Sequence, residues 1–177
     1  MATSSSSVPP PTGSERLLDA ERDVQARLGD FPLDFPALDA ISNIYRAAVA
    51  VRRRAERNVL AEHGLSFGGF TILWVLWVWD EMETARLAEE CGLAKGTLTG
   101  MLTTLEKQDL VERHRVPADK RRVLVKLTAA GTALISLVFP QFNRFESQVS
   151  SQLTVAEKKE LARLLRLITT GANPTDA

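Results

Sequence analysis

The sequence predicts a mostly α-helical fold that carries one small β-hairpin. Apolar residues recur at three- and four-residue steps over most of the chain, as expected for helices with one buried face. This period changes to two only within residues 111–127. The composition, 45% hydrophobic and 25% charged over 177 residues, is typical of a single globular domain that can bury a core.

The composition also excludes several classes of protein. The single cysteine, Cys91, cannot form an internal disulfide. The longest apolar run, residues 70–79, is shorter than the roughly 20 residues of a membrane-spanning helix. No signal peptide is predicted at the N-terminus, so a cytoplasmic location is expected. The 22 basic and 22 acidic residues exclude a uniformly basic nucleic-acid binder but leave local patches open.

Residues 1–30 are expected to form an N-terminal extension. Ser, Pro and Gly dominate up to residue 14, which predicts disorder there, and the charged stretch that follows is weakly helical. Pro32 and Pro36 favour extended backbone in the residues before them and so end any earlier helix. From residue 37 apolar residues recur at helical steps, and Gly64 predicts that this helix ends near residue 63.

Three further helices are expected before the hairpin. Ser66 is a good N-cap for a helix that runs to residue 79 and is apolar nearly all round, which predicts that it is buried. A solvated acidic break is expected over residues 80–83. A short helix fits residues 84–91, and another fits residues 95–108 with its apolar residues on one face.

The alternating segment is interpreted as a β-hairpin. Residues 111–115 and 122–127 fit its two strands, and the basic, turn-rich residues 116–121 fit a long tip between them. Short helix, turn, helix and hairpin thus follow one another within residues 84–127, which is the order of a winged helix-turn-helix. In that arrangement the second helix can enter the major groove of DNA while the hairpin flanks it.

Two long helices are expected after the hairpin. Thr128 can cap the first, which reaches about residue 149 and contains Pro140 as a candidate kink. The second begins at a capping box formed by Thr154 and Glu157. The expected core face of this last helix is the stripe Leu161, Leu164, Leu165 and Ile168.

The distribution of charge agrees with a DNA-binding role for the segment. Residues 94–126 carry eight Lys or Arg against four Asp or Glu, whereas residues 80–93 carry five acids and one Arg. Positive charge is therefore concentrated where DNA would lie, and neutralisation of phosphates is the main sequence-independent source of affinity for DNA. A merely solvated charged face is the alternative interpretation.

Several motifs in this segment resemble the MarR family of bacterial transcription regulators. They are residues 87–93 (LAEECGL), 97–99 (TLT), 105–107 (LEK), 110–113 (LVER) and 119–128 (DKRRVLVKLT), with Gly131 after them. The resemblance spans roughly residues 36–168 and implies a homodimer on a pseudo-palindromic operator. It implies a helical dimerisation region at residues 31–63 and 128–171 and a winged helix-turn-helix DNA-binding domain at residues 64–127.

The function that this resemblance implies is a ligand-responsive regulator, expected to be a repressor. A winged-helix adaptor that binds protein instead of DNA is the alternative from another class. The sequence contains no motif typical of an enzyme, and none for a cofactor. With one Cys and two distant His, no metal site is predicted.

The resemblance also implies individual DNA contacts. Arg121 matches the family's arginine that enters the minor groove, and Asp119 matches the acid that holds it, although Asp119 could also be a simple turn residue. Ala94, Gly100 and Asp109 depart from the family's usual Ser, Arg and Gly. The predicted DNA-binding residues are Lys95, Thr97, Thr99, Gly100, Thr103, Lys107, Asp119, Lys120, Arg121 and Arg122.

Three further groups of residues have two interpretations each. Cys91 is either a redox sensor or a packing residue. The arginines at positions 52, 53, 54 and 57 either contact phosphates or form a solvated or ion-paired helix face. Aromatic residues either line a pocket for a small aromatic or amphipathic effector or belong to the core. The candidates for that pocket are Tyr45, Phe70, Trp74 and Trp77.

Overall fold

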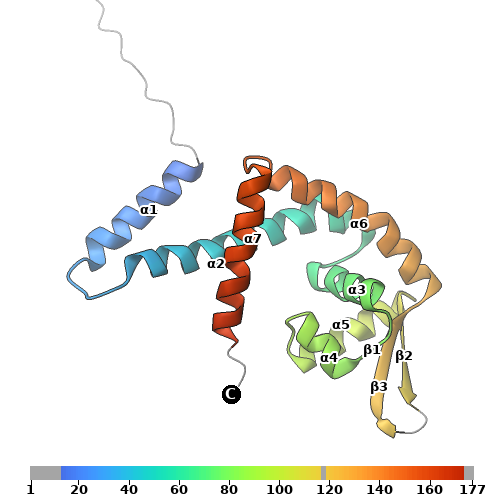
Figure 1. The fold of residues 1–177 in the computed structure, drawn as a ribbon. Helices are drawn as coiled ribbons and strands as arrows, with labels where there is room; N and C mark the ends of the chain where they lie inside the picture. Colours follow the sequence, from blue (N-terminus) through green and yellow to red (C-terminus); the bar gives the residue numbers. More distant parts are fainter. Residues whose placement is uncertain (1–12, 117–118, 174–177) are drawn as a thin grey trace, which may run out of the picture. The chain divides into compact units, whose positions relative to one another are not determined.

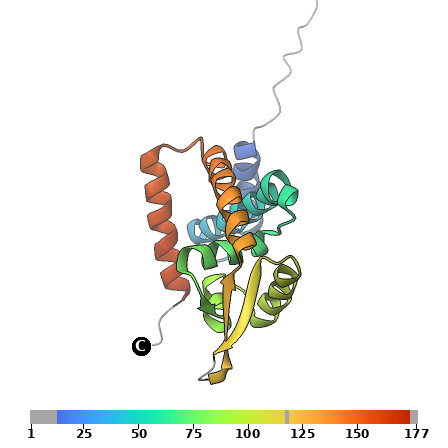
Figure 2. The same ribbon diagram turned by 90° about the vertical axis from the view of Figure 1, so that its right-hand side faces the viewer.

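A computed structural model describes residues 13–116 and 119–173, and the chain divides into two compact units between Ala50 and Val51. Helices make up most of the described residues, and one small sheet lies in the second unit (Figures 1 and 2). The predicted fold class, mostly α with a small hairpin, is therefore confirmed. The segment expected to be disordered up to residue 14 lies largely outside the described residues.

The first unit contains α1 (Gly13–Leu28) and most of α2 (Phe35–Ala55). Polar side chains connect the two helices. Asn43 of α2 donates a hydrogen bond of 2.6 Å to Glu21 of α1, and Arg46 lies 3.9 Å from the same carboxylate. The weakly helical stretch of the N-terminal extension is thus a helix of 16 residues that contacts α2.

The second unit contains the helix-turn-helix, the hairpin and two long helices after it. Its elements are η1 (Glu56–Leu60), η2 (Ala61–His63), α3 (Phe67–Trp79), β1 (Met82–Glu83), α4 (Thr84–Glu90), α5 (Lys95–Lys107), β2 (Val111–Val116), β3 (Asp119–Leu127), α6 (Ala129–Val149) and α7 (Val155–Ala172). In both views of the molecule the hairpin projects from the helices of this unit (Figures 1 and 2).

The long helix predicted for residues 37–63 ends where expected but is not one regular α-helix. α2 stops at Ala55, and the chain continues through the π-helical η1 and the 3-10 turn η2. Gly64 then ends it with a φ of 66°, in the left-handed region that glycine adopts without steric cost. Apolar periodicity could not predict the change, because all three helix types can place apolar residues on the same side over so few residues.

Polar caps begin three of the helices as predicted. Ser66 Oγ accepts the backbone N–H of Gly69 at 3.1 Å at the start of α3. Thr128 caps α6 in the same way at 3.0 Å. Thr154 and Glu157 form both bonds of the capping box at the start of α7. Each cap satisfies backbone amides that the helix leaves unpaired, which is typically worth about 1 kcal/mol.

α3 lies in the centre of the core of the second unit. Ile72 is fully buried, and Phe70 stacks on Phe142 of α6 with ring centroids 4.2 Å apart. The prediction that this nearly all-apolar helix is buried is confirmed for most of its length. Its C-terminal end differs, because Trp77 and Trp79 keep 38% and 47% of their surface exposed.

The predicted hairpin is present, but its tip is shorter than expected. β2 pairs antiparallel with β3, with Val111 opposite Leu127. β3 already begins at Asp119, so the prediction of a loop over residues 116–121 is wrong in extent. Three of those residues, 119–121, belong to the strand because backbone pairing continues past the point where the apolar alternation stops.

The acidic break after α3 contains a strand that was not predicted. Met82 and Glu83 form β1, which pairs with β3 in the sheet order β1-β3-β2, and Met82 lies opposite Val125. Met82 and Val125 are 4% and 0% exposed, so this side of the sheet faces the core. Two residues are too few for a detectable alternation, which is why the segment looks like a solvated break in sequence.

The apolar stripe of α7 does not join the core of the chain, contrary to the prediction. Every described residue of this helix is at least partly exposed. The apolar spacing predicted a buried face, but no other described element covers that face. The predicted core residues keep between 36% and 46% of their surface exposed: Leu161, Leu164, Leu165 and Ile168.

No single helix among the described residues is long and apolar enough to cross a membrane. Only the adjacent segments Phe35–His63 and Phe67–Trp79, taken together across a bend, reach that length and composition. In the same part of the chain, no group of three or more His, Cys, Asp or Glu side chains could hold a metal ion.

Candidate nucleic-acid interface

α4 and α5 form a helix-turn-helix around a tight glycine turn. Gly92 has a φ of 62°, and Leu93 donates its N–H back to the carbonyl of Ala88 at 2.8 Å. Ala94 then begins α5 in an extended conformation without a side-chain cap. The departure from the family's usual Ser therefore leaves the first amides of α5 without that partner.

α5 buries one face and exposes the other, as its sequence predicts. Leu98, Leu102 and Leu105 are at most 3% exposed. All six residues predicted to contact DNA from this helix are exposed, and none is acidic: Lys95, Thr97, Thr99, Gly100, Thr103 and Lys107. Neither Lys95 nor Lys107 forms an ion pair with a described residue.

The threonines on this exposed face direct their hydroxyl hydrogens to the helix itself. Thr99 donates to the carbonyl of Lys95 at 2.9 Å, and Thr103 donates to that of Thr99 at 3.0 Å. Their oxygen lone pairs and methyl groups are therefore what the surface offers to a partner. A Cβ atom built on Gly100 would meet no atom within 4 Å, so the helix backbone is open to close approach here.

A bidentate ion pair connects the hairpin to α5. Arg113 of β2 donates through Nε to Glu106 of α5 at 2.8 Å and through a second nitrogen to the other carboxylate oxygen. The hydrogen bonds from Arg113 lower the pKa of Glu106, and the same bonds raise the pKa of Arg113. Sequence reasoning named these residues in separate motifs and missed the pair, because only the turn between α5 and β2 brings them together.

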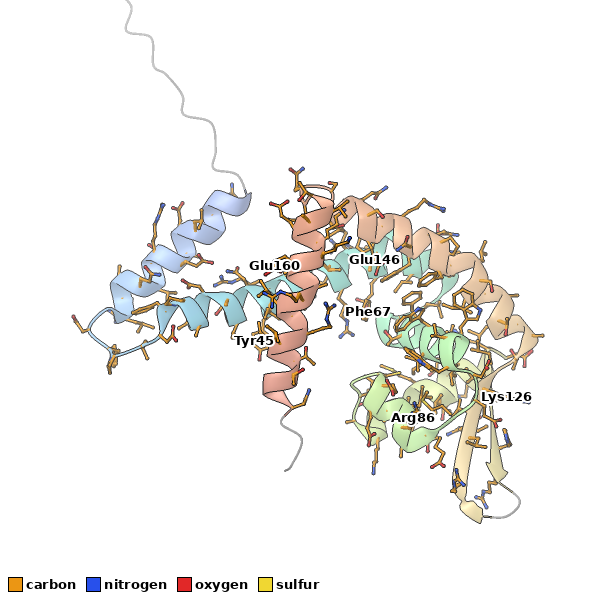
Figure 3. The ribbon with its side chains drawn as sticks, in the orientation of Figure 1. Tyr45, Phe67, Arg86, Lys126, Glu146 and Glu160 are labelled. Carbon is orange, nitrogen blue, oxygen red and sulfur yellow. The ribbon has the colours of Figure 1, made fainter. Side chains whose placement is uncertain are left out.

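The sheet face opposite the core, here called the outer face, carries charged residues from all three strands. Strand alternation and the register place Glu83, Arg122, Lys126, Glu112 and His114 on this face. Arg122 donates to Glu83, Lys126 Nζ lies 2.9 Å from Glu112, and His114 lies 3.0 Å from Glu81. Figure 3 shows Lys126 on the hairpin. The hydrogen bond that its ammonium donates to Glu112, with a smaller effect of Glu81, raises the pKa of Lys126.

Four of the predicted DNA-binding residues lie on β3. Arg122 is held by Glu83, a partner that sequence reasoning did not foresee because β1 itself was missed. The backbone of Asp119, Lys120 and Arg121 belongs to the strand, but their side chains lie outside the described residues. The expected contact between Asp119 and Arg121 therefore stays a prediction.

The aromatic candidates for an effector pocket occupy different environments. Phe70 is in the core, and Trp74 packs edge-on against Trp79 at 5.5 Å. Tyr45 belongs to the first unit and is 69% exposed. Only Trp77 lines a described cavity, of about 420 Å³, together with residues from α3, β3 and α6. The residues around this cavity are Leu76, Trp77, Asp80, Glu81, Lys126, Leu127 and Thr132.

Cys91 has the properties of a packing residue. The side chain is half-buried against the core next to the glycine turn. Burial, with a smaller effect of Glu90, raises the pKa of the thiol to about 11, so it stays protonated at neutral pH. Since the thiolate is the form that reacts with oxidants, this environment favours the structural interpretation over the sensor.

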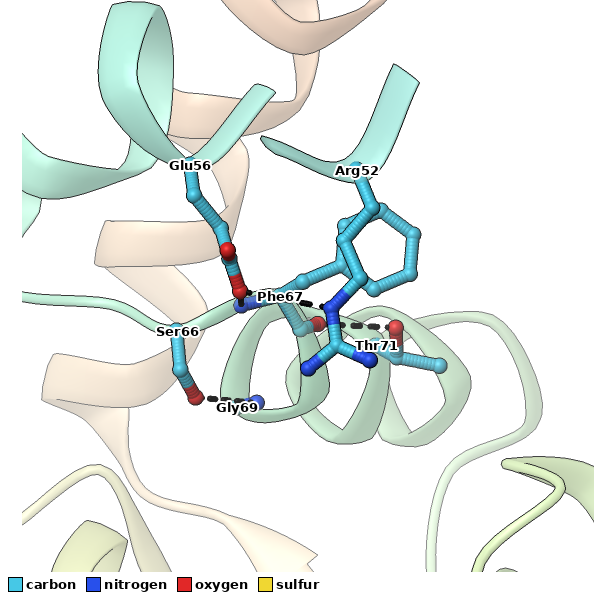
Figure 4. Close-up of polar contacts among 6 residues, drawn as sticks. All are labelled: Arg52, Glu56, Ser66, Phe67, Gly69 and Thr71. Atoms are coloured by element: carbon cyan, nitrogen blue, oxygen red, sulfur yellow. Dashed lines mark hydrogen bonds and ion pairs between the residues drawn. The ribbon is translucent and has the colours of Figure 1, made fainter. Parts of the chain in front are cut away.

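Arg52 takes part in a local cluster at the start of α3 (Figure 4). It donates to Glu56 at 3.5 Å, and its guanidinium lies 5.8 Å from the centre of the Phe67 ring. Glu56 in turn accepts the backbone N–H of Phe67 at 3.1 Å. These contacts favour an ion-paired helix face over a phosphate contact for this arginine.

Comparisons with known proteins agree with this geometry. A sequence model of the MarR family matches residues 65–123. The HTH-type transcriptional regulator YwaE of Bacillus subtilis (strain 168), described as uncharacterized, is 33% identical over 164 residues, which cover 91% of this chain and 96% of that protein.

Solved structures with the same fold include complexes with DNA and with a small molecule. A cysteine-to-serine mutant of MarR from E. coli, complexed with operator DNA, is 27% identical with a TM-score of 0.64, over 73% of this chain and 96% of that chain. NadR in complex with 4-hydroxyphenylacetate is 25% identical with a TM-score of 0.63, over 75% of this chain and 92% of that chain.

Proposed function

Since the chain belongs to the MarR family of DNA-binding transcription regulators, we propose that it is a homodimeric repressor that a small effector releases from a pseudo-palindromic operator. As such a regulator it acts in the cytoplasm, on double-stranded DNA. α5 enters the major groove, and the tip of the hairpin contacts the adjacent minor groove.

The exposed face of α5 is the observation that carries this proposal. Its fully exposed residues are Lys, Thr and Gly, and the one acid of the helix, Glu106, is partly buried and paired with Arg113. The phosphates of DNA therefore meet no unpaired acid on this face. The open surface at Gly100 supports a close approach of the backbone to the base edges. Lys95 and Lys107 contact phosphates in this arrangement, and Thr97, Thr99 and Thr103 contact bases or the sugar-phosphate backbone.

The hairpin provides the second contact. Arg113 and Glu106 fix its base against α5, so the tip and the helix can meet DNA as one rigid surface. Arg121 enters the minor groove, where an arginine is attracted by the strong negative potential of a narrow groove. Asp119 orients Arg121, and Lys120 adds a phosphate contact beside them.

The exposed stripe on α7 supports the homodimer. Leu161, Leu164, Leu165 and Ile168 form a contiguous apolar face on a helix of 18 residues, with nothing of the described chain over it. A face of this kind is typical of a protein interface, because burying it removes apolar surface from water. A second copy of the chain supplies the complementary helices.

The cavity beside Trp77 is the proposed place for the effector. Its lining combines apolar and aromatic residues with Lys126 and two acids, which suits a small aromatic or amphipathic molecule. Lys126 belongs to the hairpin and Thr132 to α6, so a ligand there would touch the DNA-binding and helical regions together. The complex of NadR with 4-hydroxyphenylacetate is a neighbour of the same fold with an aromatic ligand.

The experiment that tests the proposal is fluorescence anisotropy of the full chain on labelled DNA from the region flanking its own gene, at two salt concentrations. We expect tight binding that weakens steeply with salt, and a loss of affinity on the order of tenfold in Arg121→Ala. Arg163→Ala on α7 is the matched control, since it removes an exposed arginine away from the hairpin. A folded dimer that binds neither this DNA nor a selected random sequence would instead indicate a protein-binding adaptor.

A further inference from the structure

Two basic residues on the outer face of the sheet already form ion pairs with acids of the same chain. On the outer face, Arg122 is paired with Glu83 and Lys126 with Glu112. A cation that releases counterions when it meets a phosphate adds to DNA affinity, whereas one held by a carboxylate contributes little. The outer face therefore offers less unpaired positive charge to the phosphates of DNA than its sequence suggests.

Glu83 is placed by the backbone to hold Arg122. β1 pairs with β3 so that Glu83 lies opposite Leu124, two residues along the strand from Arg122 on the same face. The guanidinium donates through Nε to Oε1 of Glu83, and its NH2 nitrogen lies against the same oxygen. Glu83 stands at the N-cap position of α4, but its side chain accepts no capping hydrogen bond there, so pairing with Arg122 is its described polar contact.

We propose that Glu83 is a positioning residue for DNA binding: it holds Arg122 along β1, so that DNA contacts the hairpin only through its tip. The inference rests on the proposed function, because it assigns a role within the same interface. It differs from a simple charge count, which would add Arg122 to the cations that meet phosphates. If Glu83 has this role, removing its carboxylate strengthens binding to DNA of any sequence.

The test measures the salt dependence of binding to a labelled mixed-sequence duplex, so no operator needs to be known. The proteins compared are the full-length wild type and the variants Glu83→Gln, Arg122→Gln and the double variant. We expect Glu83→Gln to bind more tightly and to steepen the slope of log K against log salt by about 0.9, the contribution of one additional phosphate contact. Arg122→Gln should keep the wild-type slope, and the double variant should lose the gain.

A matched control separates this effect from a change in net charge. Glu160→Gln on α7 removes an acid that accepts two hydrogen bonds from Arg163, so it also releases one arginine and the same charge. We expect it to leave the slope at the wild-type value. Thermal unfolding of every variant shows whether the fold is retained.

Each outcome decides one point. An unchanged slope in Glu83→Gln, or a slope that becomes shallower by about one contact in Arg122→Gln, would overturn the inference and leave the proposed function intact. If Glu83→Gln unfolds, the Arg122→Gln slope still decides between the two possibilities. A wild-type protein without any salt-dependent DNA binding would overturn the proposed function and this inference together.

Discussion

The exposed face of α5 and the outer face of the sheet both carry basic residues, but they differ in whether acids of the chain pair with those residues. On α5, Lys95 and Lys107 form no ion pair with a described residue, and the fully exposed residues between them are all Gly or Thr. On the hairpin, Arg122 and Lys126 are held by carboxylates. A local excess of Lys and Arg in the sequence therefore does not show which of these cations are already held by acids of the same chain.

The two regions are held together at the turn between α5 and β2. Leu110 accepts the backbone N–H of Thr128 at 3.1 Å, and the start of α6 packs directly on it. Asp109, just before, has a φ of 57°, which is uncommon for a residue with a side chain. The family's usual glycine is thus replaced by a residue that adopts the same left-handed conformation. Breaking this junction should have the largest effect on both regions.

Gly131→Ala is the change that we expect to break it. A Cβ atom at this position would lie 1.9 Å from the carbonyl oxygen of Leu110, and a backbone atom cannot rotate away. Helix α6 would have to move, with a loss of unfolding free energy on the order of 3 kcal/mol, as for severe overpacking. Urea unfolding followed by circular dichroism measures it, and a loss below a few tenths of a kcal/mol would contradict the close packing.

The ion pair between Glu106 and Arg113 is the second connection, and its effect should depend on pH. Arg113 lowers the pKa of Glu106 in the folded state, so the pair stabilises the fold above the ordinary carboxylate pKa. That contribution should be lost as the pH falls through the lowered pKa of Glu106. We expect Glu106→Gln to be about 1 kcal/mol less stable than the wild type at neutral pH, with a difference that vanishes in acid.

Urea unfolding of both proteins across that pH range measures the effect. Glu160→Gln is the comparison variant. Arg163 also lowers the pKa of Glu160, but that pair is more exposed and joins residues of one helix, so we expect a smaller pH-dependent difference. If the stability difference between Glu106→Gln and the wild type were the same at all pH values, the ion pair would not be its cause.

Sequence alone predicted the elements of this interface better than the contacts between them. The caps at Ser66 and Thr128, the glycine turn and the buried face of α5 follow from local rules, so they could be assigned from neighbouring residues. β1 could not, because two residues carry no period. Missing β1 also hid the partner of Arg122, since Glu83 is 39 residues away in sequence and reaches it only through strand pairing.

The smallest effect is expected for a substitution at Gly100, on the exposed face of α5. In Gly100→Ala, the new methyl group meets no atom within 4 Å, and alanine favours the helix by about 0.5–1 kcal/mol over glycine. The variant should therefore be slightly more stable than the wild type. It should also bind DNA less tightly, because the methyl group would stand between the helix backbone and the base edges.

Gly96→Ala is the matched variant, since its new methyl group also meets open space but lies one turn nearer the start of α5. Comparing the DNA affinity of the two variants shows where along the helix the backbone comes closest to DNA. Should Gly100→Ala gain stability and keep full affinity, the glycine would serve no close approach. The interface would then depend on Lys95, Lys107 and the threonine methyl groups, which stand out from the helix at either side of that position.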